Sequence, residues 1–301
     1  MGSPASRGGL GIVADDPADD MADDMVARAA ADARRAADDA GVVVRAAETV
    51  PEVEALIRVG EAVWGPQGTL ATNEMRALAF AGSVVLGAFD REGGEEPVGF
   101  LIGFLGWNGG LHLHSHQTGV VPGRRRAGVG YALKLAQREI CLRHGIAEVR
   151  WTFDPLIRRN TAFNLGRLGA RAEQFLPDFY GRMSDALNLD DLSDRLEAVW
   201  LLADPLPAPS AAGADGRIPG AGRRPGVLVD DGGWPAETAV APAAGHHLAV
   251  PADFAGLRSG NPDAARAWRL AVRRVLSAAY ADGLRIGSVD DDGYVLTAAD
   301  A

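Results

Sequence analysis

Hydrophobic and polar positions divide the chain into two patterned regions separated by a stretch without a period. Between positions 42 and 182, short apolar runs typical of strands alternate with stretches whose apolar residues recur at helical spacing. In chain order, the pattern predicts a strand (42–47), two helices (51–64 and 72–81), three strands (83–89, 97–105 and 111–121), a helix (130–144), a strand (148–153), a helix (161–168) and a strand (172–180). If the strands flanking helix 130–144 are parallel neighbours, their crossover is expected to be right-handed.

A second, smaller pattern follows a linker. Residues 203–226 are mostly Pro, Gly and Ala, a composition typical of linkers. Beyond them we expect short strands at 227–229 and 247–250, an amphipathic helix at 262–280, and a hairpin formed by 284–289 and 294–297. The chain is thus predicted to contain a tail (1–40), a main domain (41–203), a linker (204–226) and a small αβ module (227–301). The module is short for an independent core, so we expect it to pack on the main domain or on a second subunit, as in a homodimer.

Charge separates the tail from the rest of the chain. Residues 1–40 contain nine Asp and four Arg, which is half of the formal net charge of −10. With few large apolar residues, such a segment gains too little from burial to offset the entropy of ordering. We expect disorder over residues 1–24 and a solvated helix over residues 25–39. An acidic interaction arm, a solubilising tail and an over-extended gene start all remain open.

Composition also excludes several classes of function. The net negative charge argues against nucleic acid as a partner, since that requires a basic surface. The best apolar run, 98–107, is short and interrupted by glycines, so no membrane span is expected. The amino terminus lacks the pattern of a secretory signal, and the single cysteine, Cys141, fits a reducing compartment, so a cytoplasmic location is expected.

The most informative motif is the turn that joins strand 111–121 to helix 130–144. It reads Val120-Val121-Pro122-Gly123-Arg124-Arg125-Arg126-Ala127-Gly128-Val129-Gly130. Glycines allow backbone N–H groups to approach an anion closely, and the helix that follows directs its amides and positive dipole end toward the same place. Arginine adds a charge that cannot be titrated away. The motif predicts a pyrophosphate-binding turn, and the alternative is a surface turn whose arginines pair with the acidic tail.

This motif resembles the acetyl-CoA-binding pattern Arg/Gln-x-x-Gly-x-Gly/Ala of the GNAT superfamily of N-acetyltransferases. Arg125, Gly128 and Gly130 occupy the three defined positions, and the order of predicted elements over 42–182 is similar to that of the family. The turn does not fit the Rossmann fingerprint, which needs a third glycine and a later acidic residue, or a P-loop, which needs Gly-Lys-Ser/Thr.

The resemblance implies an α/β fold with a mixed, mostly antiparallel central sheet, in which one parallel pair of strands splays apart between flanking helices. It implies acetyl-CoA as the acyl donor, with its pantetheine arm bonded to the first splayed strand like an extra strand. The residues that it assigns to cofactor binding are Thr118, Gly119, Val120, Arg125, Arg126, Ala127, Gly128, Val129, Gly130 and Asn160. No metal is expected.

The catalytic residues are less well defined. The Tyr that the family often uses as general acid is absent, since Asn164 and Leu165 stand at its place, and Tyr180 is the nearest candidate. His112, His114 and His116 share one face of their strand unless a bulge intervenes, and His116 is the candidate general base. Structural histidines are the alternative, and a zinc site with Asp154 is a third reading.

Asp154 follows the second splayed strand, where the acceptor is expected to enter. Its carboxylate is a candidate to hold an ammonium group, with Trp151 as a wall, although Asp before Pro also ends strands in ordinary turns. The implied reaction is direct attack of an amine on the thioester, stabilised by a backbone N–H of the splayed strand. The sequence therefore predicts an N-acetyltransferase acting on a small-molecule amine. The alternative is a non-catalytic CoA-binding, sensing or assembly module on the same fold.

Overall fold

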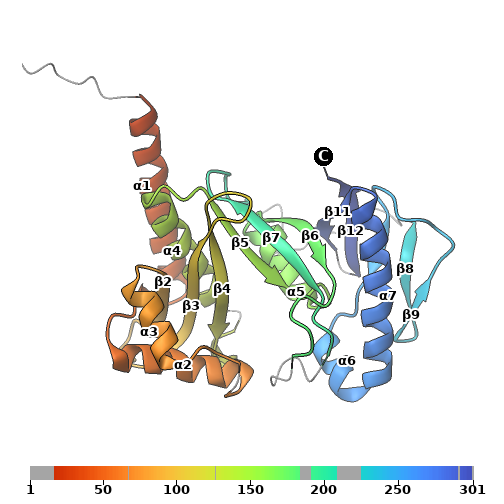
Figure 1. Ribbon diagram of the computed structural model, residues 1–301, viewed down its shortest axis with the longest axis horizontal. Coiled ribbons are helices and arrows are strands. Elements are labelled where there is room, and N and C mark those ends of the chain that lie inside the picture. The colour runs from red at the N-terminus through yellow and green to blue at the C-terminus, as the bar shows by residue number, and fades with distance from the viewer. Residues whose placement is uncertain are drawn as a thin grey trace, which may run out of the picture.

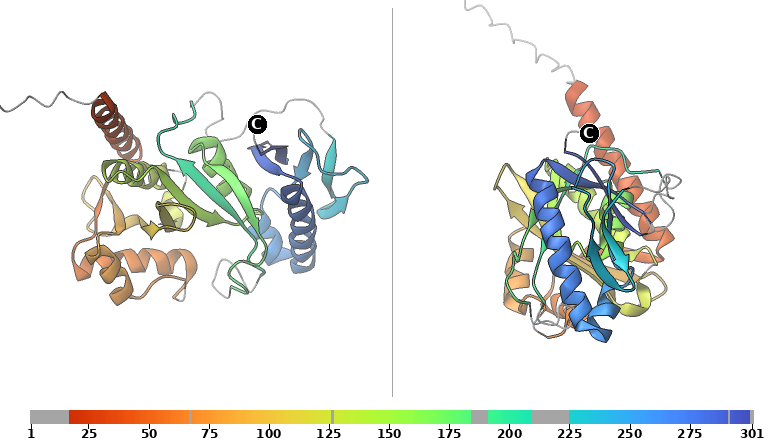
Figure 2. Two further views of the ribbon diagram at one scale, coloured as in Figure 1. Left: turned by 45° about the horizontal axis from the view of Figure 1, so that its top comes forward. Right: turned by 90° about the vertical axis from the view of Figure 1, so that its right-hand side faces the viewer.

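Two β-sheets with their covering helices make up the protein (Figures 1 and 2). The computed structural model describes residues 17–66, 68–125, 127–183, 191–208, 225–290 and 292–299. Most of the predicted linker, residues 209–224, lies outside these ranges, and so do residues 1–16 of the segment 1–24 that was expected to be disordered, whereas residues 17–24 are helical. Within them, no helix is both long enough and apolar enough to cross a membrane.

The larger sheet has the strand order β1-β2-β3-β4-β5-β7-β6. Its strands are β1 (Val42–Ala46), β2 (Val84–Asp90), β3 (Pro97–Gly106), β4 (His112–Val120), β5 (Glu148–Phe153), β6 (Arg171–Leu176) and β7 (Arg195–Leu201). Its neighbouring strands pair antiparallel except β4 and β5, which are parallel. The predicted fold class, a mixed and mostly antiparallel sheet containing a parallel pair, is confirmed.

Strands β4 and β5 separate soon after they meet. Their ladder contains only Leu113 opposite Val149 and His114 opposite Arg150. On its other edge, β4 pairs with β3 along its whole length, but with a bulge: Gly103 lies opposite Ser115 and Ile102 opposite Gln117, so His116 is the extra residue. A bulge bends its strand and increases the local twist. The bulge at His116 therefore coincides with the point where β4 leaves β5.

Helices cover both faces of this sheet. Helix α4 (Val129–Arg143) packs on one face, where Leu133 and Leu135 share a core with Leu86 and Leu101. On the other face, α2 (Val50–Trp64) and α3 (Thr72–Phe80) pack against Val85, Phe100 and Ile102. Neighbouring residues of β2 and β3 thus point to opposite faces, as the two-residue period of a strand requires.

Helix α1 corrects the expectation for the amino-terminal tail. The structure contains one helix over Pro17–Asp39, which begins earlier than the expected helix at 25–39, and it lies along α4 (Figure 1). Ala29 and Ala36 are buried in the main core, and Asp32 pairs with Arg138 of α4 at 3.3 Å. The helix is therefore packed on one side rather than solvated, because small alanine side chains let it approach α4 closely.

The order of the last strands differs from the prediction. The strand expected at 172–180 corresponds to β6 (Arg171–Leu176), which lies at the edge of the sheet. A further strand that was not predicted, β7 (Arg195–Leu201), lies between β5 and β6. The short helix expected at 161–168 is α5 (Arg158–Thr161) continued by the π-helical turn η2 (Ala162–Arg167). The turn before α4 contains the 3-10 segment η1 (Pro122–Arg124).

The second sheet has the order β11-β12-β10-β8-β9 and is covered by helix α7. The predicted strands, helix and hairpin are confirmed as β8, β10, α7, β11 and β12, whereas β9 and α6 were not predicted. The bounds are β8 (Gly226–Asp231), β9 (Trp234–Glu237), β10 (His247–Ala249), α6 (Phe254–Gly260), α7 (Pro262–Ala281), β11 (Leu284–Val289) and β12 (Gly293–Ala298).

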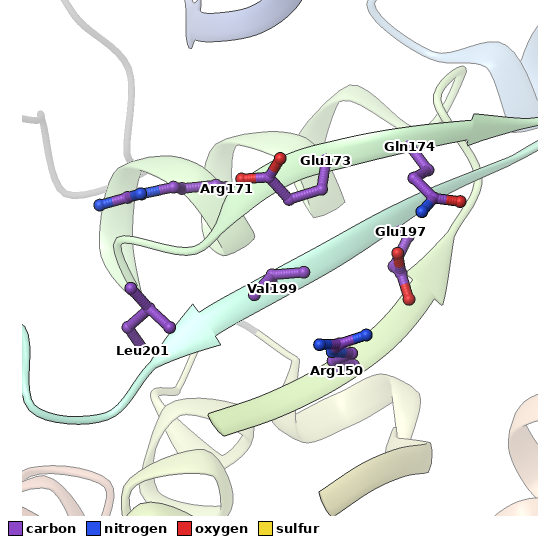
Figure 3. Close-up of a pocket in the computed structure, with 7 residues that line it drawn as sticks. All are labelled: Arg150, Arg171, Glu173, Gln174, Glu197, Val199 and Leu201. Carbon is purple, nitrogen blue, oxygen red and sulfur yellow. The ribbon is translucent and has the colours of Figure 1, made fainter. Parts of the chain in front are cut away.

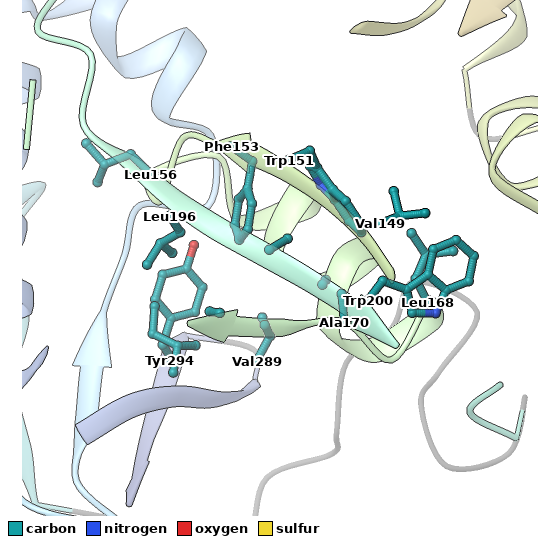
Figure 4. Packing of buried hydrophobic residues seen from close by; sticks show 14 of the residues in the cluster. Val149, Trp151, Phe153, Leu156, Leu168, Ala170, Leu196, Trp200, Val289 and Tyr294 are labelled. Atoms are coloured by element: carbon teal, nitrogen blue, oxygen red, sulfur yellow. The ribbon is translucent and has the colours of Figure 1, made fainter. Parts of the chain in front are cut away.

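The two sheets share one hydrophobic core. Figure 4 shows Phe153 and Leu196 of the first sheet close to Tyr294 and Val289 of the second. The buried Tyr294 hydroxyl bonds Thr161 Oγ1 at 2.9 Å and also donates to the Pro155 carbonyl. The carboxy-terminal module therefore packs on the larger sheet of its own chain, one of the two arrangements expected. The division into domains and the homodimer stay predictions.

Candidate functional site

A cavity of about 970 Å³ lies where β4 and β5 separate. Trp64 and Thr69 line it from the α2 side of the sheet, Tyr131 and Lys134 from the α4 side, and Arg258 of α6 from the carboxy-terminal module. The cavity thus reaches both faces of the sheet through the opening between the strands. Eleven of the sequence-predicted site residues line it: His116, Thr118, Gly119, Val120, Arg125, Gly128, Val129, Gly130, Asp154, Asn160 and Tyr180.

A second hollow, of about 320 Å³, lies on the outer face of β5, β7 and β6 (Figure 3). Charged side chains dominate its lining, among them Arg150, Glu173 and Glu197. Arg150 is already paired with Glu148. Since none of the predicted site residues line this hollow, the larger cavity is the candidate site.

The turn before α4 forms one end of the large cavity. Gly128, the residue before the helix, has φ +82°, a conformation that L side chains rarely adopt. A Cβ added at Gly130 would lie 3.9 Å from Val120, so no crowding surrounds that position. Tyr131 and Ala132 donate their N–H groups to the Gly128 carbonyl, and the amides of Val129 and Gly130 point out of the helix end. The local geometry is that of an anion-binding helix terminus.

The arginines of this turn have different roles. Arg124 donates to the Ala40 carbonyl at 3.2 Å and pairs with Asp90, so it ties the turn to the sheet. Arg125 is exposed and lines the cavity, and its Nε donates to the Val120 carbonyl at 3.3 Å. Ala127 is exposed in the same turn. Arg126 lies outside the described residues.

The backbone of β4 beyond the bulge forms a second wall. Thr118, Gly119 and Val120 pair with β3 on one edge, while the other edge faces the cavity because β5 has moved away. An extended ligand can therefore bond to this free strand edge as a further strand would. Asn160, whose N–H donates to Ile157 at 2.8 Å, approaches from α5 on the β5 side.

The three histidines do not form one cluster. His112 is buried, and its Nδ1 contacts the Gly110 carbonyl at 2.8 Å. His114 and His116 lie on one face beside Phe104, with ring centroids 6.0 Å apart. Burial, followed by repulsion from neighbouring cations, lowers the pKa of His114 to about 4. Desolvation also lowers the pKa of His116 below its ordinary value of about 6.5, so this imidazole, which lines the cavity, is mostly neutral at pH 7.

Asp154 has a partner that the sequence reasoning missed. Its two oxygens accept from Arg269 of α7 at 2.8 and 2.7 Å, and Oδ1 also accepts from the Leu156 N–H at 2.8 Å. The pKa of Asp154 is lowered although burial opposes ionisation, because Arg269 stabilises the carboxylate. Asp154 lines the cavity but its charge is already compensated, so a role in holding an ammonium group stays a prediction that this ion pair does not support.

Tyr180 lies beside Thr152, near the carboxyl end of β5. Its hydroxyl is 3.0 Å from Thr152 Oγ1, and its ring stacks under Arg195 at 5.4 Å. It is 45% exposed, whereas Asn164, at the place where a catalytic Tyr was expected, is buried. Trp151 lines the cavity, as expected for a wall residue. The role of Tyr180 as an acid stays a prediction.

Lys134 is a buried titratable residue in the cavity that sequence reasoning overlooked. It is buried, with 3% exposure, and its Nζ donates to Ser115 Oγ at 2.8 Å and lies 3.9 Å from the centre of the Trp151 ring. Burial lowers its pKa to about 7. A signal was present, since Lys134 is the only lysine in a chain whose 29 other basic residues are arginines.

Comparisons with known proteins find similarity to solved N-acetyltransferases. No family model matches the chain, and no curated protein matches its sequence. Similar structures include a NatC complex bound to Gag peptide and CoA (13% identity over 53% of this chain and 98% of that chain, TM-score 0.44). They also include the ribosomal-protein-S18-alanine N-acetyltransferase of Escherichia coli (13%, 55% and 96%, 0.43) and a GNAT-family acetyltransferase of Streptococcus pneumoniae (12%, 56% and 99%, 0.43). These similarities concern the fold and cover about half of this chain.

Proposed function

We propose that the protein is an acyl-CoA-dependent N-acyltransferase that moves an acetyl group from acetyl-CoA to the amine of a small molecule. The observation that carries the proposal is the cavity between β4 and β5, which connects the helix terminus at Gly128–Gly130 with His116. An anion site, a free strand edge and a neutral imidazole therefore follow one another along a single cavity. This order matches a ligand with a pyrophosphate, an extended arm and a reactive end.

The lining residues fit such a donor. The amides of Val129 and Gly130, with the Arg125 guanidinium, would hold the pyrophosphate, and the φ of +82° at Gly128 presents them to it. From Val120 to His116 the strand advances roughly 13 Å. Backbone groups of this free edge would bond the pantetheine arm and leave the thioester beside the bulge at His116. The thioester supplies the activated acyl group.

The chain's own residues then prepare the acceptor. His116 is neutral at pH 7 and can take a proton from an ammonium group, directly or through water. A backbone N–H of β4 can stabilise the negative charge that develops on the carbonyl oxygen. Arg258 and Ala255 of α6 bound the cavity from the carboxy-terminal module. This additional wall favours a small acceptor over a long peptide.

Binding of the donor tests the first half of the proposal. Isothermal titration with acetyl-CoA is expected to give micromolar binding, which Arg125→Glu weakens at least tenfold by placing a carboxylate beside the pyrophosphate. The matched control is Arg143→Glu, a charge reversal at the exposed far end of α4, the helix that follows the turn, and it is expected to leave binding within threefold. Absence of binding to the wild-type protein rejects the proposal.

Turnover tests the second half. A panel of small amines, followed by the release of free CoA thiol, is expected to identify an acceptor. A protein that binds CoA tightly but turns over no amine in the panel would instead be a binding or sensing module on the same fold.

A further inference from the structure

Lys134 occupies the point where the two strands part. Ser115, which accepts its hydrogen bond, follows the last β4 residue paired with β5, and Trp151, under its ammonium group, follows the last paired residue of β5. Both side chains face α4, so Lys134 reaches from the helix into the apex of the opening. The same apex contains His116, beside which the proposed function places the thioester.

We propose that Lys134, held by Ser115, is the acid that protonates the departing CoA thiolate, an inference that rests on the proposed function. A thiol with an ordinary pKa near 8.5 leaves as a thiolate that needs a proton at neutral pH. Tyr180 is the other candidate, but its hydroxyl already bonds Thr152 Oγ1 and its side chain is exposed, whereas Lys134 is buried. Lys134 is a buried proton donor at the point where β4 and β5 part, beside which the proposed function places the thioester end of acetyl-CoA.

The step balances. The acceptor nitrogen bonds to the carbonyl carbon, the carbon–sulfur bond breaks with its electron pair going to sulfur, and Lys134 gives that sulfur a proton. The new amide nitrogen loses its extra proton to His116 or water, and neutral Lys134 regains a proton from solvent. The net products are the amide, CoA thiol and the proton that the acceptor ammonium released.

The surroundings allow Lys134 to change its charge near neutrality. Burial lowers the pKa of Lys134 to about 7, so both forms are populated. Its titratable neighbours are uncharged at that pH, because burial raises the pKa of Cys141 to about 12 and lowers that of His114 to about 4. The charged groups packed around α4 have partners of their own: Asp32 with Arg138, Asp154 with Arg269, and Arg167 over the Tyr131 ring.

A magnetic resonance titration tests the inference without mutation. Since the chain has a single lysine, protein labelled with ¹³C at lysine Cε gives one lysine signal, which reports the protonation of Lys134. The signal is expected to titrate near pH 7 in the free protein. With CoA bound, the titration midpoint is expected to rise by about one pH unit relative to desulfo-CoA, because a nearby thiolate favours the ammonium form.

The outcomes separate this inference from the proposed function. A shift that requires the thiol supports the role of Lys134. If CoA and desulfo-CoA both bind and give the same Lys134 titration, the inference is overturned while the CoA site stands. If neither binds, the proposed function itself fails, and the inference with it.

Kinetics of variants give a second readout. Lys134→Met, which keeps nearly the length of the side chain, is expected to lower kcat about 100-fold with little change in the KM of acetyl-CoA. A loss of this size is typical when a general acid is removed. Gln137→Met is the matched control: Gln137 is buried one turn further along α4, accepts from Lys134 Nζ at 3.4 Å and donates to Ser115 Oγ at 3.2 Å, but it does not line the cavity. An equal loss in both variants would overturn the proton-donor role, since it would show that the buried hydrogen bonds among Lys134, Gln137 and Ser115 matter rather than the proton of Lys134.

Discussion

Asp154, the residue after strand β5, binds Arg269 of helix α7 through both carboxylate oxygens, at 2.8 and 2.7 Å, across 115 positions of sequence. Asp154 is 8% and Arg269 1% exposed, and Asp191 adds a further acceptor to Arg269 at 2.9 Å. The pair connects the carboxy-terminal module to the strand that forms one arm of the cavity. The geometry of the cavity is therefore coupled to the docking of the module.

Breaking this ion pair is expected to destabilise the whole protein. Arg269→Met removes the guanidinium and leaves the Asp154 carboxylate buried without its main partner, which costs about 3 to 5 kcal/mol of unfolding free energy. Urea denaturation followed by circular dichroism measures the change. The matched control is Arg274→Met on the same helix, where an exposed pair with Glu237 contributes less than about 1 kcal/mol. Equal effects of the two substitutions would contradict a special role of the buried pair.

The stabilisation by Asp154 is expected to depend on pH at the acid end. Its pKa is lower in the folded protein than the ordinary value of about 3.9, so its contribution is fully present above pH 4 and is lost as the pH falls through the folded value. The difference in stability between the wild type and Asp154→Asn should therefore be large at pH 7 and shrink below pH 4. Urea denaturation at a series of pH values checks this, and a difference that stays constant from pH 7 to 3 would rule it out.

The geometry of the turn before α4 could be predicted from the sequence because its determinants are local. Gly128 and Gly130 follow a strand directly and open a helix, and the structure shows the positive φ and the exposed helix end that such a pattern requires. The parallel pair β4–β5 was expected from the resemblance to the GNAT superfamily, and the structure contains it.

Long-range relationships were not predictable in the same way. Strand β7 carries an alternating pattern, with Leu196, Ala198 and Trp200 buried, but no local signal says that it inserts between β5 and β6. The partner of Asp154 lies on a helix of another sheet, and the bulge at His116 is visible only in the pairing with β3. In the sequence, Lys134 looks like any other residue of a helix. Only the structure shows that it lines the cavity between β4 and β5.

Helix α1 was expected to be solvated because its charge outweighs its apolar surface, yet one face is buried. Ala29→Glu would force a carboxylate between α1 and α4, and it is expected to cost about 1 to 3 kcal/mol through overpacking and burial of charge. Ala27→Glu, on the exposed side of the same helix, is expected to change stability by less than about 0.5 kcal/mol. Thermal unfolding of the two variants compares them, and equal melting temperatures would mean that α1 does not pack on α4 in solution.

His116 gives the pH dependence that best tests its place in the reaction. As a base it must be neutral, and since desolvation lowers its pKa, kcat/KM for the acceptor amine should rise with pH below pH 6.5, before the fall that deprotonation of Lys134 near pH 7 brings on the alkaline side. His116→Ala is expected to lower kcat/KM about 100-fold and to remove this rise. His114→Gln is the matched control, because His114 shares the same face beside Phe104 but does not line the cavity, and its rate should stay within threefold of the wild type. An unchanged profile in His116→Ala would show that the proton leaves by another route, such as water in the cavity.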